Sequence, residues 1–466
     1  MKHPKIVVLG AGSFFFGRPV IWNMVTSDVL KNGTLALVDT NPSVLKTIKD
    51  LADRAVDHAA APCDILASTE RKDVLKDADF VVTTFSDRNA HFRGVDTEIS
   101  AKYGVRMCSS DTIGPGGIFR ALREMPKLMD MARDVERAAP DAWMINFVNP
   151  TTVLGIALMR YANIRSFAIC DGHHEPHHRL RRLKAVGILD DDAREIPSEV
   201  EQKLDYRVGG VNHFTWLVKF TYDGKDYMPA LYEIVKARAE DERKMNTADQ
   251  STFDANTHSK AKYNSAYTQI LWDIYGAYPD TVGHTKEYVP FFQGFGVTKI
   301  DPEEIVLFDA EERMGKMADR WAETEKFSTG ELPIDQFIAG GTGDHATDII
   351  ESMWGHLGKS FYINSANRGS VTNMADDAFL ELRCDLDVHG PRPQPFGDMP
   401  RGLLGLQQQV LDTHELTAQA GAECDRDLLY RAMCTDPIVN NAGDAKKIME
   451  DLLEAERDAL SKKWFA

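Results

Sequence analysis

Cysteines are few in this chain, and their positions exclude two kinds of fold. Six cysteines are spread over 466 residues, without a CxxC pair or a short repeating spacing. A zinc ribbon and a disulfide framework both require clustered cysteines. We therefore predict neither, and the scattered thiols favour a cytoplasmic location.

The chain also lacks long hydrophobic runs. No stretch reaches the ~18 apolar residues that a membrane-spanning helix needs, and the apolar residues 6–9 lead into glycines rather than into a cleavable leader. With 33 glycines and 20 prolines, the composition is not that of a fibrous or low-complexity chain. We expect a folded protein with no membrane partner and no export signal.

Positive charge is in the minority. The 54 lysines and arginines are outnumbered by 71 aspartates and glutamates, which gives a net charge of −17. Such a surplus of negative charge repels phosphate backbones and anionic membrane surfaces. Nucleic acid is therefore not an expected partner.

Residues 2–171 show β-branched runs that alternate with amphipathic stretches, the pattern of βαβ units. Strands are expected at residues 5–9, 34–39, 79–84, 143–147 and 166–170, with helices at 14–26, 41–59, 118–138 and 150–161. This predicts an α/β chain with a Rossmann-like, doubly wound domain over residues 1–200. Ligands of such sheets lie beyond the carboxyl ends of the strands, and the polar residues expected there are Gly10, Asp39, Asn149, Cys170 and Asp171.

The pattern changes after about residue 200. Strands are expected at residues 205–208, 214–222, 359–364 and 379–384, together with long helices at 403–420 and 445–460. Mixed strands and helices predict an α+β substrate domain over residues 201–466.

A glycine-rich turn joins the first strand to the first helix. Gly10 would permit the tight turn, Gly12 would let the backbone approach a pyrophosphate, and the following helix would supply its N-terminal dipole. Asp39 would bond a ribose diol and repel a 2′-phosphate, which favours NAD over NADP. The usual third glycine position holds Phe15, which leaves a purely structural turn as an alternative. The expected cofactor-binding residues are Gly10, Gly12, Ser13, Phe14, Asp39 and Asn149.

A second glycine cluster, residues 110–123, places a turn directly before a helix. Its free N–H groups could hold a carboxylate or a sugar hydroxyl, or the loop could simply pack against the nucleotide. Cys170 and Asp171 at one strand end, together with Asn212 and His213, could hold a divalent ion. Cys170 could equally be a small core residue and His213 a core histidine. The histidine-rich residues 173–178 are predicted to form a loop and a helix start rather than a zinc site.

Several segments together resemble glycoside hydrolase family 4 or a close sister family. The resemblance spans most of the chain, and its most specific stretch is DTIGPGGIFRALR at residues 111–123. It also includes the Gly10-Ala-Gly12 loop, residues 93–99, Asn149-Pro150, Cys170, Asn212-His213, HTKEYVP at 284–290, residues 364–373 and Asp436-Pro437. Members of this family are glycosidases that require NAD and a divalent metal.

The resemblance implies a redox route to glycoside cleavage. NAD⁺ takes a hydride from C3, the ketone acidifies the C2 proton, elimination expels the C1 group, water adds, and NADH returns the hydride. Cys170 and His213 would ligate the metal, usually Mn²⁺, and Asp171 would assist the leaving oxygen. Tyr267 is the first choice for the C2 base and Tyr263 the second, although both could merely pack on a helix.

The expected substrate is an α-glycoside, and the expected assembly a homodimer or homotetramer. An anionic C6 group, as in a sulfoquinovoside or a glucuronide, ranks above a neutral α-galactoside. The residues expected at the substrate are Arg88, His91, Arg93, Asp111, Asn149, Asn212, His284 and Arg368. A plain NAD-dependent hydroxy-acid dehydrogenase and a non-catalytic NAD-sensing module remain alternatives.

Overall fold

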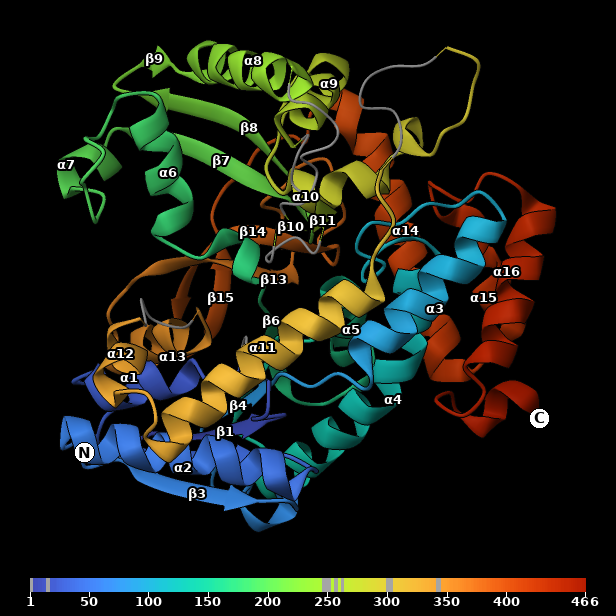
Figure 1. Ribbon diagram of the computed structural model, residues 1–466. Helices are drawn as coiled ribbons and strands as arrows, with labels where there is room; N and C mark the ends of the chain where they lie inside the picture. Colours follow the sequence, from blue (N-terminus) through green and yellow to red (C-terminus); the bar gives the residue numbers. More distant parts are fainter. Residues whose placement is uncertain are drawn as a thin grey trace.

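The computed structural model describes residues 3–13, 17–244, 253–254, 259–260, 264–298, 305–340 and 345–466. Phe14 and Tyr263, two of the predicted site residues, lie outside these ranges. Figure 1 shows an α/β protein in which one sheet passes through the middle and helices surround it.

The N-terminal half of the sheet is parallel. Its strands follow the order β3-β2-β1-β4-β5-β6, which is the Rossmann order. Their bounds are β1 Lys5–Leu9, β2 Thr34–Val38, β3 Asp64–Ser68, β4 Phe80–Thr83, β5 Trp143–Asn146 and β6 Arg165–Ala168. The central strands are almost completely buried, as expected for strands covered on both faces. The predicted Rossmann-like fold is therefore confirmed.

The second half of the sheet is antiparallel and continues from β6. The strands are β13 Ser360–Ala366, β14 Phe379–Asp387, β7 Leu204–Val211, β8 Phe214–Tyr222 and β12 Tyr278–Pro279, with β15 Gly390–Pro393 and β9 Lys225–Asp226 at the margins. The two halves join where Asn364 of β13 pairs with Ala168 of β6. The sheet thus crosses the predicted boundary near residue 200 without a break, and that boundary stays a prediction.

Helices cover both faces of the sheet. The longer ones are α2 Pro42–Ala59, α3 Asn89–Lys102, α4 Gly114–Ala138, α5 Thr151–Tyr161, α8 Met228–Lys244, α9 Asn264–Tyr275, α11 Ala310–Thr329, α13 His345–Gly355, α14 Arg401–Glu423, α15 Arg426–Thr435 and α16 Ala442–Ala455. Helix α11 runs diagonally across the front in Figure 1 and packs on both α2 and α3. Helix α11 therefore connects the helix that follows β2 with the helix that precedes the glycine-rich residues 110–123.

Two predicted helix bounds were wrong. Helix α1 spans Val20–Thr26 and leaves out residues 17–19, which were predicted to be helical, because Pro19 disfavours helical geometry in the residue before it. The predicted start at residue 14 lies outside the described residues. Helix α16 ends at Ala455 rather than continuing to residue 460, since Glu456 turns inward and is fully buried against Arg123. The exposed edge strand β3 was not predicted, because only its neighbour β2 supports it.

No helix among the described residues is long and apolar enough to cross a membrane.

Candidate functional site

The first glycine loop has the geometry of a dinucleotide turn. Gly10 has φ +93°, and a Cβ there would lie 2.7 Å from the Thr84 carbonyl oxygen. The Gly12 amide donates to Asp39 Oδ2 at 2.9 Å, and the Ser13 amide donates to the Gly10 carbonyl at 3.0 Å. Asp39 is therefore held at the end of β2 beside a backbone that only glycines allow, as a ribose-binding carboxylate requires.

Cys170 and His213 meet at the carboxyl end of β6. Cys170 Sγ lies 3.2 Å from His213 Nε2, and both side chains are buried. His213 has φ +62° and sits between β7 and β8, so the turn itself aims its ring at the thiol. Two residues far apart in sequence thus present a sulfur and a nitrogen to the same point.

The second ring nitrogen of His213 also has polar neighbours. His213 Nδ1 lies 3.4 Å from Thr112 Oγ1 and 4.0 Å from Asp111 Oδ1. A metal-binding histidine typically uses one ring nitrogen as the ligand and donates from the other to an oxygen. Burial raises the pKa of the Cys170 thiol, which a bound cation would reverse. The donor set, spacing and orientation fit a divalent metal with open positions for substrate oxygens.

Asp111 is the centre of the second half of the site. Its carboxylate lies 3.9 Å from His284 Nδ1, 3.5 Å from Arg120 Nη1 and 3.9 Å from Arg93 Nη2. The Asn149 amide donates to it at 3.5 Å. The His284 ring stacks on the His213 ring at 4.0 Å, so Asp111 joins the metal candidates to a group of arginines.

That group contains three buried guanidinium groups. Burial lowers the pKa of Arg93 to about 10 and of Arg313 to about 9, and it also lowers the pKa of Arg120. Asp111 acts on all three of them, Glu287 acts on Arg93, and Glu124 and Asp96 act on Arg120. Sequence analysis missed Arg120 and Arg313 as site residues. Arg120 lies in the specific motif, whereas nothing local in the sequence marks Arg313.

The loop that carries Asp111 is anchored by groups distant in sequence. Glu287 accepts the Cys108 and Ser109 amides at 2.8 and 2.9 Å, and the Tyr288 hydroxyl donates to Thr112 Oγ1 at 2.7 Å. Asp436 accepts the Gly114 amide at 2.8 Å. The HTKEYVP segment and the Asp436-Pro437 segment therefore hold the glycine-rich loop in place through hydrogen bonds.

Three of the predicted substrate residues are not brought to Asp111. Arg88 is exposed and pairs with Asp458 at 3.1 Å, and His91 is exposed beside Phe92. Arg368 is also exposed, and it donates to the Pro391 carbonyl. Closeness to a strand end in the sequence did not predict which side chains reach Asp111. Arg93 in α3 is buried near Asp111, whereas Arg88, just before the same helix, is exposed.

The acid and base candidates lie in different surroundings. Asp171 begins the short 3₁₀ helix η2 Asp171–His173, and desolvation by the surrounding protein raises its pKa. Tyr267 is buried on α9 and packs edge-on against Phe292 at 4.7 Å, with Lys286 Nζ 5.1 Å from its ring centroid.

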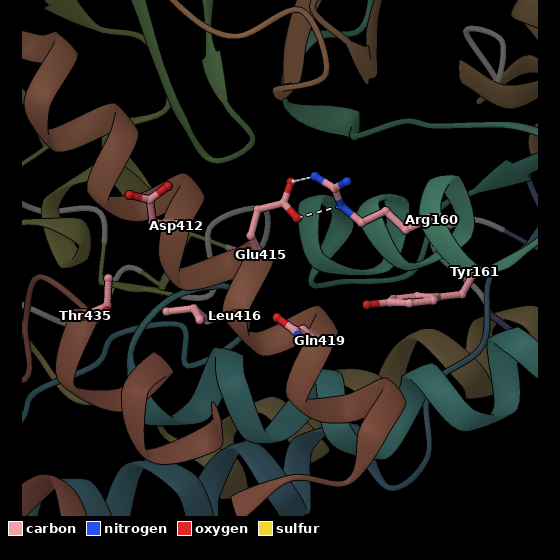
Figure 2. A pocket seen from close by; sticks show the side chains of 7 residues that line it. All are labelled: Arg160, Tyr161, Asp412, Glu415, Leu416, Gln419 and Thr435. Atoms are coloured by element: carbon pink, nitrogen blue, oxygen red, sulfur yellow. Dashed lines mark hydrogen bonds and ion pairs between the residues drawn. The ribbon is translucent and has the colours of Figure 1, made fainter. Parts of the chain in front are cut away.

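A separate surface hollow of about 540 Å³ lies between α5 and α14. Figure 2 shows it with the Arg160 guanidinium paired to both oxygens of Glu415. Its lining residues are Arg160, Tyr161, Asp412, Glu415, Leu416, Gln419 and Thr435. None of the predicted site residues is among them, so this hollow is distinct from the cluster around Asp111.

The chain is similar over nearly its full length to several known glycosidases. An α-galactosidase of Bacillus subtilis is 28% identical over 462 residues, covering 98% of this chain and 99% of that protein. An α-galacturonidase of Thermoanaerobacterium saccharolyticum is 26% identical, covering 98% and 96%. The structure of a 6-phospho-α-glucosidase from gut microorganisms, solved in complex with NAD and Mn²⁺, superposes with a TM-score of 0.74 at 19% identity, covering 98% and 99%.

Family models cover most of the chain. The family 4 glycosyl hydrolase model matches residues 5–186, and the model of the C-terminal domain of that family matches residues 208–439. NAD and manganese, the predicted cofactors, are bound in solved structures that share this fold. The chain belongs to family 4 of the glycosyl hydrolases.

Proposed function

We propose that this glycosidase cleaves an α-glycoside whose C6 group is anionic, a uronide or a sulfoquinovoside. The three buried guanidinium groups of Arg93, Arg120 and Arg313 near Asp111 carry the proposal. A planar carboxylate or a sulfonate accepts paired N–H bonds from a guanidinium group. The α-galacturonidase relative supports the same substrate class.

Each residue has a part in this proposal. Cys170 and His213 would hold Mn²⁺, and the Gly10 loop with Asp39 would hold NAD in the cytoplasmic enzyme. When bound, NAD supplies a hydride acceptor for C3 and the cation supplies a Lewis acid for the resulting ketone. Asn212 Oδ1 is buried with no partner among the described side chains, so it can accept a sugar hydroxyl.

The proton transfers fall to Asp171 and a tyrosine. The raised pKa of Asp171 suits a carboxylic acid that protonates a leaving oxygen. Tyr267 is the proposed C2 base. Asn149 and His284 line the space beside Asp111 and would orient the sugar.

The test is hydrolysis of nitrophenyl α-glucuronide, α-galacturonide, α-sulfoquinovoside and α-galactoside, with and without NAD⁺ and Mn²⁺. We expect cleavage of an anionic substrate that needs both additives and forms no net NADH. Arg93→Met should lower kcat/KM for that substrate by roughly 10- to 100-fold, the loss of one charged hydrogen bond. Arg88→Met is the matched control. Steady NADH formation without cleavage would instead establish a dehydrogenase.

A neutral α-galactoside is the second candidate, because an α-galactosidase is 28% identical over nearly the full length. Preference for the α-galactoside, with no change in that preference in Arg93→Met, would select it. Gel filtration with light scattering tests the expected homodimer or homotetramer.

A further inference from the structure

A second buried polar cluster lies behind Cys170 and His213. It joins η2, helix α6 His177–Ala185, the residue after β12 and strand β14. Its members, all buried, are His173, His178, Arg182, Asp280 and Glu381. The histidines belong to the segment that the sequence pattern assigned to a loop and a helix start, and Asp280 approaches them from about 100 residues away.

Asp280 holds three of these side chains. Its Oδ2 contacts His173 Nε2 at 2.9 Å and also His178 Nε2, while its Oδ1 accepts Arg182 Nη2 at 2.9 Å. Glu381 Oε1 lies 3.2 Å from His173 Nδ1. His173 is thus placed between two carboxylates, one at each ring nitrogen.

The cluster could be mistaken for a metal site, since His173, His178 and Asp280 offer three possible ligand atoms within 4.8 Å of one another. Both Nε2 atoms, however, face the same carboxylate oxygen and donate hydrogen bonds to it, so neither Nε2 offers a lone pair to a cation there. Burial lowers the pKa of His173, but Glu381 and Asp280 outweigh this and raise it to about 10. Two carboxylates, one imidazolium and Arg182 then sum to zero charge without a metal.

The cluster reaches the proposed metal ligands through one amide. Asn212 Nδ2 donates to Glu381 Oε2 at 3.0 Å, and Asn212 directly precedes His213. Glu381 and Asn212 are both buried, so the carboxylate fixes the side chain next to His213 at the turn between β7 and β8.

We propose that Glu381 and His173 are positioning residues of the metal centre. Glu381 holds the Asn212 side chain and thereby the turn that aims the His213 ring, and His173, placed between Asp280 and Glu381, keeps Glu381 in position. The inference rests on the proposed function, in that it takes Cys170 and His213 as the metal ligands. Supporting groups of this kind typically change metal affinity about 10- to 100-fold when they are removed.

The first experiment measures Mn²⁺ binding directly, by electron paramagnetic resonance of the free ion, with NAD present. Glu381→Gln should raise the Mn²⁺ dissociation constant about 10- to 100-fold and shift the thiolate-to-metal absorption band of the Co²⁺-loaded protein. The dissociation constant for NAD should stay within about twofold, since the Gly10 loop is far along the sheet. Glu201→Gln, the same substitution at a half-exposed site paired with Arg179, is the matched control.

A double variant keeps the proposal testable if Glu381→Gln unfolds the protein. The combination His173→Gln with Glu381→Gln removes one positive and one negative charge, so the remaining pair of Asp280 and Arg182 stays neutral. It should fold, bind NAD and bind Mn²⁺ weakly. Unchanged Mn²⁺ affinity and an unchanged Co²⁺ band in the folded variants would overturn the proposal.

Two further results separate this inference from the metal assignment itself. Elemental analysis of the wild-type protein should give one divalent metal per chain, and two per chain would place an ion in the cluster and overturn the proposal. If Cys170→Ser binds Mn²⁺ as the wild type does, the ligand assignment fails, and the positioning role falls with it. If Cys170→Ser loses Mn²⁺ but Glu381→Gln does not, only the positioning role is wrong.

Discussion

The ionisation of Asp436 makes the stability of this protein depend on pH in a way that one substitution should remove. Asp436 is buried, and its oxygens accept the amides of Gly114 and Ile438 at 2.8 and 3.0 Å. Burial outweighs these bonds and raises its pKa to about 7 from an ordinary value of 3.8. Between those two values the folded protein keeps a proton that the unfolded chain has lost, so stability falls as the pH rises and levels off above about pH 7.

The size of this effect follows from the pKa difference. One unit of pKa difference corresponds to about 1.36 kcal/mol of unfolding free energy. The raised pKa of Asp436 therefore lowers the unfolding free energy by roughly 1.6 kcal/mol at pH 5 and by roughly 4.4 kcal/mol at pH 8. Wild type should therefore lose about 3 kcal/mol between pH 5 and pH 8 from this residue. Asp436→Asn, which cannot ionise, should lack that loss, although it surrenders part of one backbone hydrogen bond at every pH.

Urea unfolding of both proteins at pH 5 and pH 8 measures the difference, and the subtraction cancels all other titrating groups. Asp335→Asn, in the exposed first turn of α12 Ile334–Ala339, controls for the loss of a carboxylate. Profiles of wild type and Asp436→Asn that run parallel within about 0.5 kcal/mol would refute the reasoning.

Four further substitutions test the cofactor loop, the metal ligands and the packing of α4. Gly12→Ala places a Cβ 2.2 Å from a Val44 methyl and should weaken NAD binding about tenfold or more in a fluorescence titration, whereas the open Gly315→Ala should not. Cys170→Ser should abolish tight Mn²⁺ binding by calorimetry. Arg123 lies between Asp96 and Glu456, and burial raises the pKa of Glu456 well above its ordinary value. Glu456→Gln should thus cost less than about 1 kcal/mol of unfolding free energy, but Arg123→Met about 3 kcal/mol or more.

Local sequence patterns predicted the parallel half of the molecule well. Strands such as β1 and β5 bury consecutive apolar residues between two helical layers, and this requirement appears as an uninterrupted run in the sequence. The Gly10 loop was equally predictable from the sequence, because its backbone geometry excludes a side chain at Gly10 and Gly12.

The site was only partly predictable. Cys170, His213, Asp111, Asn149 and His284 follow from strand ends and from the family motifs, and the structure brings them together. Arg88 and Arg368 are basic residues in the right segments, yet their side chains face outward. A residue type within a motif does not specify which side of the backbone its side chain occupies.

The sequence by itself determined the fold class, the dinucleotide turn and the family, since each depends on contacts or conformations within a few consecutive residues. Only the tertiary structure decided that Arg313 is buried where Asp111 acts on its charge and that Asp280 and Glu381 enclose His173. These groups come from elements separated by about 100 residues or more. Their meeting depends on how helices and the antiparallel strands pack around one buried volume, and no short sequence pattern encodes that arrangement.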